Sequence, residues 1–129
     1  MIYGIGVDIV SMPRMKNAID RWGDAFLNKV FTQAEQQYCL ERHDSGCRFA
    51  LRFAAKEALL KALGIGLTSG ITLKEIEIIN NRLGKPSLLL HGKAHALCFT
   101  NNITTNFLSL SDDGNYAIAM VVLEKSLHE

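Results

Sequence analysis

The chain has neither an excess of charge of one sign nor a long apolar run. Its 129 residues carry a formal net charge of +1, so no overall field would attract nucleic acid or an anionic membrane surface. No apolar stretch approaches the ~18–20 residues that a membrane-spanning helix needs. With 48% hydrophobic and 21% charged residues, the composition is typical of a soluble globular protein. We therefore expect neither a nucleic-acid nor a membrane partner.

Metal and redox motifs built on cysteine and histidine are missing too. Cys39, Cys47 and Cys98 are scattered and form no CxxC pair, which favours reduced thiols and a cytoplasmic location. His91 and His95 have the i, i+4 spacing of a helical metal site, but no HExxH glutamate accompanies them. The apolar N-terminus has no basic start, so we do not expect a secretory signal.

Two glycine-rich segments lack the residues of the common nucleotide-binding motifs. Gly4-x-Gly6 has no third glycine and leads directly into no helix, which argues against a dinucleotide fingerprint. Segment 64–70 follows an expected helix and contains no Gly-Lys-Ser/Thr, so it is not a phosphate-binding Walker loop. The first pair of glycines allows close approach of another backbone or a ligand, and the second segment is typical of a helix end.

The hydrophobic pattern predicts a single domain over 1–129 of the α+β class, with an antiparallel sheet packed against a long central helix. A capping box at Thr32 and Glu35 marks one helix start, and Asp112-Asp113-Gly114-Asn115 is a hairpin signal. Strands are expected at 2–10, 73–80, 87–91, 105–111 and 116–124, and helices at 11–21, 24–30, 32–43, 47–63 and 92–100.

Two acidic residues lie where the local pattern favours apolar side chains. Asp8 interrupts an apolar run that is typical of a buried strand, and Glu57 lies in an otherwise apolar helix between Lys56 and Lys61. A carboxylate in such a segment is costly unless it is paired or holds a cation. Mg²⁺ takes oxygen ligands, often one or two carboxylates together with substrate phosphates. The pair therefore predicts a shared Mg²⁺ site, with Lys61 suited to a phosphate oxygen.

Basic residues recur on two of the expected helices. Arg48, Arg52 and Lys56 are spaced by four residues, which is the pattern of a solvated helix face with one ion pair. Arg14 and Arg21 are seven apart and share a face of the first helix. They either attract an acidic partner over a long range or form a solubilising surface.

These positions also occur together as one pattern along the chain. It consists of Ile2-Tyr3-Gly4-Ile5-Gly6-Val7-Asp8-Ile9, Arg14, Phe31-Thr32, Arg52-Phe53-Ala54-Ala55-Lys56-Glu57-Ala58, Lys61-Ala62-Leu63-Gly64, Gly84-Lys85-Pro86 and Ser109-Leu110-Ser111. In this pattern the chain resembles the holo-acyl-carrier-protein synthases, the small phosphopantetheinyl transferases of bacterial fatty-acid synthesis. The resemblance spans essentially the whole chain.

The resemblance implies an enzyme that moves the 4′-phosphopantetheine arm of coenzyme A onto a serine of apo acyl carrier protein and releases adenosine 3′,5′-bisphosphate. It implies that Asp8 and Glu57 bind the Mg²⁺ cofactor and that Lys61 neutralises phosphate charge, which makes these three the catalytic residues. The serine supplies the nucleophile, and a base must take its proton; we expect Glu57, or a metal-held water that it orients.

The same resemblance assigns binding roles to other positions. Gly64, Lys85 and Pro86, together with Lys61, are expected to bind coenzyme A. Arg14 and Arg21 are expected to receive the acidic helix of the carrier protein, in agreement with the shared basic face.

The family is a homotrimer with each active site between two subunits, so the turn after Ser111 is expected to approach a neighbour's coenzyme A. The family usually has a histidine directly after that strand, where this chain has Asp112. A carboxylate beside phosphate is repulsive unless a cation or proton intervenes. Two alternatives therefore stay open: a different Mg²⁺-dependent phosphoryl-transfer enzyme, or a coenzyme A- or carrier-binding module with impaired activity.

Overall fold

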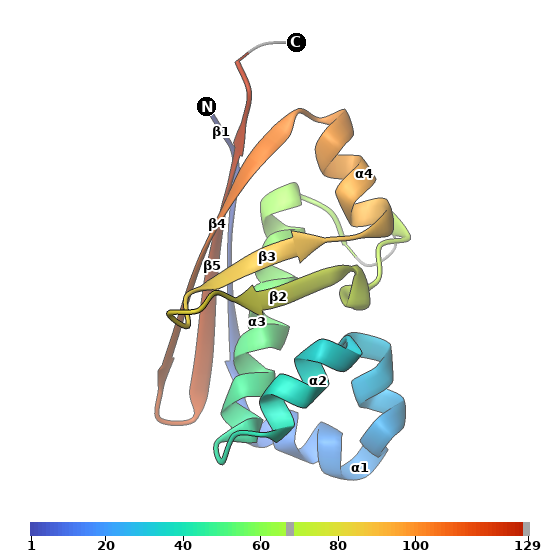
Figure 1. Ribbon diagram of the computed structural model, residues 1–129, viewed down its shortest axis with the longest axis vertical. Coiled ribbons are helices and arrows are strands. Elements are labelled where there is room, and N and C mark those ends of the chain that lie inside the picture. Colours follow the sequence, from blue (N-terminus) through green and yellow to red (C-terminus); the bar gives the residue numbers. More distant parts are fainter. Residues whose placement is uncertain (67–68, 128–129) are drawn as a thin grey trace.

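The computed structural model describes residues 1–66 and 69–127 and has helices packed against antiparallel strands (Figure 1). The α+β class with antiparallel pairing is confirmed. In chain order the elements are β1 (Ile2–Ser11), α1 (Met12–Val30), α2 (Gln33–Leu40), α3 (Ser45–Leu63), the 3₁₀ helix η2 (Leu73–Glu75), β2 (Ile76–Asn80), β3 (Pro86–Leu90), α4 (Gly92–Thr100), β4 (Ile103–Asp113) and β5 (Tyr116–Lys125).

The strands form two sheets, with α3 between them. One sheet has the order β1-β5-β4, and β2 pairs with β3 in a separate hairpin. Helix α3 contacts β1 and β5 on one side and β2 on the other (Figure 1). The side chains that β5 turns toward α3 alternate along the strand and are fully buried, as period two requires: Ala117, Ala119, Val121 and Leu123.

Strand β1 approaches α3 more closely than side chains would allow. A Cβ atom added to Gly4 would lie 1.9 Å from the carbonyl oxygen of Ala62, and one added to Gly6 would lie 1.9 Å from that of Ala58. The two backbones are therefore in direct contact, which is the close approach that the glycines predicted. Because alternate residues of a strand share a face, Asp8 lies on the same side of β1 and also faces α3.

The opposite face of β1 is apolar and exposed. Ile5, Val7 and Ile9 are 58%, 52% and 60% exposed. The interpretation of this run as a buried strand is therefore wrong for much of β1 in the chain alone. Gly4, Gly6 and Asp8 are turned toward α3, Ile5, Val7 and Ile9 point outward, and Val10 packs against the core. Phe107 on β4 and Met120 on β5 extend this outer face, and both are about half exposed.

Several element boundaries differ from the expected ones. The expected strand 73–80 begins with the 3₁₀ turn η2, because Thr72 and Glu75 form a capping box that favours a helical start. The helix that begins after Thr32 ends at Leu40, before the expected His43. The break expected at Gly23 is a kink inside α1, with φ at 55°.

The interpretation of Arg48, Arg52 and Lys56 as one solvated face is wrong for two of the three. Arg52 is 3% exposed and Lys56 is fully buried. The Lys56 ammonium is 2.8 Å from Oε1 of Glu35, which is also fully buried. Helix α3 is enclosed by the sheet on one side and by α2 and the hairpin on the other, so most of this face is shielded from solvent. Only Arg48 remains partly exposed, and it pairs with Asp44.

We predict that replacing Gly6 by alanine lowers the free energy of unfolding by about 3 kcal/mol, because the methyl group would overlap a backbone carbonyl that cannot rotate away. Urea denaturation measures the change. Gly46→Ala is the matched control, since nothing lies within 4 Å of a Cβ at that position of α3, and it should be neutral or slightly stabilising. Equal stability of the two variants would contradict the contact between β1 and α3.

Candidate active site

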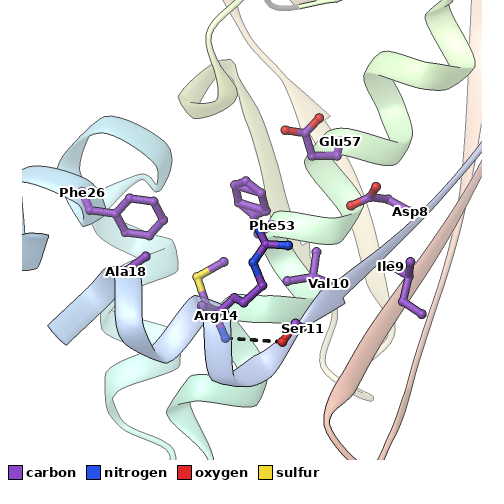
Figure 2. Close-up of a pocket in the computed structure, with 10 residues that line it drawn as sticks. Asp8, Ile9, Val10, Ser11, Arg14, Ala18, Phe26, Phe53 and Glu57 are labelled. Atoms are coloured by element: carbon purple, nitrogen blue, oxygen red, sulfur yellow. Dashed lines mark hydrogen bonds between the residues drawn. The ribbon is translucent and has the colours of Figure 1, made fainter. Parts of the chain in front are cut away.

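A groove of about 390 Å³ opens where β1, α1 and α3 meet (Figure 2). Its polar lining consists of Asp8, Ser11, Arg14 and Glu57. Its apolar lining includes Phe53 on α3 and several residues of β1 and α1. The structure thus brings together, in one groove, two predicted metal ligands and one predicted partner-binding arginine that are distant in sequence.

The turn from β1 into α1 places Arg14 over the groove. Ser11 is the N-cap of α1, and its hydroxyl accepts a hydrogen bond from the backbone N–H of Arg14 at 3.4 Å. Pro13 lies in the first turn, where its missing N–H has no intrahelical partner to lose. The Met12 N–H donates to the carbonyl oxygen of Asn115 at 2.7 Å, which fixes the start of the helix against the β4–β5 turn.

Asp8 and Glu57 are neighbours in the groove, and a lysine pairs with Asp8. The Asp8 side chain is 16% exposed, and its Oδ1 lies 2.9 Å from Nζ of Lys61, which is 55% exposed. The same ammonium also donates to the carbonyl oxygen of Val7 at 3.1 Å. Lys61 therefore neutralises Asp8 directly and remains accessible for contact with a ligand.

Among the described residues Glu57 has no such direct partner, and the pKa of its carboxyl reflects this. Burial raises the pKa of the Glu57 carboxyl above its ordinary value, the negative charge of Asp8 raises it further, and Lys61 opposes both. Figure 2 shows the two carboxyl groups on one side of the groove, with Arg14 reaching toward it from α1. The site holds more negative charge than its nearest cation offsets.

The described residues contain no group of three or more histidine, cysteine, aspartate or glutamate side chains that could hold a metal ion. Two carboxylates match the protein ligands that Mg²⁺ commonly takes, because water and substrate oxygens complete its shell. His91 and His95 do not form a pair: the His91 ring is 2.8 Å from Glu77, and His95 lines a different hollow, near α4.

The lining of this groove includes none of the four predicted coenzyme A residues, although Lys61 pairs with Asp8 beside it. Gly64 ends α3 with φ at 76°, and its N–H donates to the Lys61 carbonyl, so it lies one turn beyond Lys61. Pro86 lines a second hollow of about 340 Å³, and Lys85 directly precedes it in the chain. Arg21 lies farther along α1, with its guanidinium 5.0 Å from the centre of the Trp22 ring.

The second hollow contains two arginines whose spacing in the sequence predicts a solvated helix face. Arg48 and Arg52 line it together with Pro86 and Asp112. Arg52 donates from Nη2 to Asn80 Oδ1 at 2.7 Å, while its buried Nε has no hydrogen-bond partner within residues 1–66 and 69–127. The apolar residues around Arg52 in the sequence were the signal that this guanidinium is enclosed.

Asp112, where the family usually has histidine, faces this second hollow. Burial raises the pKa of the nearby Cys47 thiol, and the Asp112 carboxylate raises it further. Asp112 therefore lies beside a neutral thiol and in the same hollow as the Arg48 guanidinium.

Comparison with known proteins gives the family. The model of the 4′-phosphopantetheinyl transferase superfamily matches residues 4–121. The chain belongs to this superfamily. A holo-[acyl-carrier-protein] synthase from Geotalea daltonii is 52% identical over 125 residues, which are 97% of this chain and 100% of that protein.

Solved structures of the superfamily have the same fold. The holo-[acyl-carrier-protein] synthase of Neisseria meningitidis matches with a TM-score of 0.90 and 35% identity over 97% of this chain and 100% of that one. The Helicobacter pylori synthase, solved in complex with coenzyme A, matches with a TM-score of 0.83 and 31% identity over 93% and 99%. The predicted family is confirmed, and the chain is an enzyme of the phosphopantetheinyl transferase class.

We predict that Asp8→Asn lowers the pKa of Glu57, because it removes the like charge that disfavours ionisation. The pKa should stay above its ordinary value, since burial is the larger cause. A ¹³C-NMR titration of the metal-free protein measures it, with Asp20→Asn on α1 as the control. A Glu57 pKa that does not change would show that the two carboxylates do not interact.

Proposed function

We propose that this chain transfers the 4′-phosphopantetheine arm of coenzyme A to a serine of apo acyl carrier protein, in fatty acid biosynthesis, with Mg²⁺ as the cofactor. The observation that carries the proposal is the groove lined by Asp8, Glu57 and Arg14, in which Asp8 is paired with Lys61. The family and the named activity of its full-length relatives support the same reaction. Adenosine 3′,5′-bisphosphate is the expected second product.

The residues of the groove fit a divalent cation. Asp8 and Glu57 supply oxygen ligands, and the repulsion that raises the Glu57 pKa is the kind that a bound cation relieves. When bound, Mg²⁺ would offset negative charge on the pyrophosphate of coenzyme A. Waters and substrate oxygens complete the coordination shell of a hard cation such as Mg²⁺, so the two carboxylates are enough protein ligands.

Lys61 and Glu57 have separate roles in the proposed phosphoryl transfer. Positioning and charge neutralisation dominate such reactions, and the Lys61 ammonium is placed to contact a phosphate oxygen near Asp8. The serine oxygen of the carrier attacks phosphorus, and the bond from phosphorus to the leaving phosphate oxygen breaks. Glu57 accepts the serine proton, directly or through a water that it orients.

We further propose a homotrimer with active sites between subunits. The exposed apolar face of the β1-β5-β4 sheet, from Ile5 to Met120, supports it, because such faces usually meet another protein. The separation of Pro86 from the Asp8 groove supports it as well: both sets can contact one coenzyme A if they come from two copies. The arginines of the second hollow would then meet phosphate from the neighbour's ligand. Sedimentation equilibrium measures the oligomeric state, and a monomer would contradict the proposed trimer.

The three cysteines are free thiols, in keeping with a reducing compartment, and we place the reaction in the cytoplasm. No helix among the described residues is long and apolar enough to cross a membrane. Subcellular fractionation tests the location, and recovery of the chain outside the cytosolic fraction would contradict it.

One assay separates this function from its alternatives. The protein is incubated with Mg²⁺, coenzyme A and apo acyl carrier protein, and the carrier is weighed by mass spectrometry. A gain equal to the phosphopantetheine arm supports the transfer. Cleavage of coenzyme A without labelling favours another phosphoryl-transfer enzyme, and binding without either product favours a module that Asp112 has impaired.

In that assay, Glu57→Gln should lower kcat by more than ~100-fold, because it removes a metal ligand and the proposed base. Glu41→Gln makes the same substitution at the exposed end of α2 and should leave the rate unchanged. Turnover near that of the unaltered protein in the Glu57 variant would remove this residue from the mechanism.

Arg14→Glu should raise the KM for the carrier protein at least tenfold at low salt and reduce its salt dependence, with coenzyme A affinity unchanged, because the attraction to an acidic helix is lost. The control is Lys74→Glu, which changes the net charge by the same amount at a residue of η2 outside the groove. Parallel loss of carrier and coenzyme A binding would place Arg14 in the nucleotide site. The same measurement on Arg21→Glu tests the second predicted contact.

A further inference from the structure

Lys56 is the most completely enclosed charge in the described part of the chain. Its side chain is fully buried, and its Nζ contacts three oxygens: Glu35 Oε1 at 2.8 Å, the Leu73 carbonyl at 3.0 Å and the Ile76 carbonyl. An ammonium has three N–H donors, so every donor is used. The three acceptors belong to α2, η2 and β2, and Lys56 therefore ties α3 to three separate elements.

Both carboxylate oxygens of Glu35 also accept hydrogen bonds from the backbone. Its Oε1 also accepts from the Thr32 N–H at 3.0 Å, and its Oε2 accepts from the Ile78 N–H at 3.0 Å. The carboxylate thus joins the start of α2 to strand β2 and cannot move without breaking backbone hydrogen bonds. We call these two residues and the carbonyls of Leu73 and Ile76 the Lys56 anchor.

Stability alone is a weak reason for such a pair. Removing two charges from water costs free energy that their attraction often fails to recover, and apolar replacements of similar size are frequently no less stable. What an ion pair with full hydrogen bonding does supply is one fixed geometry. Such a fixed geometry would constrain the residues next to Lys56 on α3.

Glu57 is the next residue on the same helix. Successive residues of an α-helix point about 100° apart around its axis, so the direction of Lys56 toward α2 and β2 sets the direction of Glu57 toward the groove. On its other side α3 contacts β1, at Gly6 and Ala58. That contact fixes the distance between helix and strand, and the Lys56 hydrogen bonds to α2 and η2 add a directional constraint on the rotation of α3.

We propose that Lys56 and Glu35 are positioning residues for the groove: the anchor fixes the rotation of α3 and thereby holds the Glu57 carboxylate opposite Asp8. This inference rests on the proposed role of the groove as a metal site. A rotation of about 10° displaces an atom about 6 Å from the helix axis by about 1 Å. Misplacement of about 1 Å at a reacting centre can reduce a rate on the order of 100-fold.

Manganese binding to the free protein tests the inference without turnover. The double variant Lys56→Met/Glu35→Gln removes the three donors and also the charge that would otherwise stay buried and unpaired. Folding is checked by circular dichroism and a cooperative thermal transition, and Mn²⁺ affinity is measured by electron paramagnetic resonance. We expect at least tenfold weaker Mn²⁺ binding and a similar loss of kcat, with the KM for carrier protein within twofold of its original value.

The control is Leu88→Ala, a core deletion in β3 that lowers stability but leaves the anchor in place. Leu88 is 7% exposed. A purely structural role for the ion pair predicts that Mn²⁺ affinity follows the melting temperature in both variants. Our inference predicts that only the anchor variant loses affinity. A folded double variant that binds Mn²⁺ as tightly as the unaltered protein overturns it.

Glu35→Asp decides the question if the double variant does not fold. It keeps both charges but withdraws the carboxylate by one methylene, so Lys56 must follow it or lose the contact. Severalfold weaker Mn²⁺ binding supports the inference, and unchanged binding overturns it. Glu57→Gln separates this result from failure of the proposed function: if that variant also binds Mn²⁺ normally, the groove is not the metal site at all.

Discussion

Direct contact between the backbones of β1 and α3 positions the charged groups of the groove. Gly4 and Gly6 lie against carbonyl oxygens of α3 with no room for a side chain. The strand therefore runs along the helix at a distance that larger residues would not permit. Asp8, on the same face, reaches the region of Glu57 and Lys61, which are nearly fifty residues or more away in sequence. Without this contact the carboxylates would belong to two separate surfaces.

The two groups of carboxylates and lysines in this protein differ in how completely their charges are neutralised. Lys56 and Glu35 are buried together, and every donor of the ammonium has an acceptor. Asp8 pairs with the half-exposed Lys61, Glu57 interacts with it only at longer range, and the pKa of Glu57 is raised by its burial and by the charge of Asp8. A satisfied ion pair fixes structure, whereas an incompletely neutralised pair in a groove is available to a ligand. The metal proposed for the groove follows from this contrast.

Local signals predicted most of the elements and failed where distant segments intervene. The capping box at Thr32, the kink at Gly23 and the β4–β5 hairpin follow from residues within one turn of each other, and each is present. The burial of Lys56 was missed, because a spacing of four residues marks one helix face without indicating what covers it. The 3₁₀ start of the expected strand 73–80 was also missed, although its capping box of Thr72 and Glu75 is a local signal.

The sequence by itself determined the family, the α+β class and the identity of the two carboxylates, because these depend on residue types, periods and spacings. The tertiary structure decided that Glu57 and Asp8 are neighbours, that Pro86 lines another hollow, and that the apolar residues of β1 face outward. The physical reason is that strand and helix periods fix which residues share a face. Which face is covered, and by what, depends on packing between segments far apart in the chain.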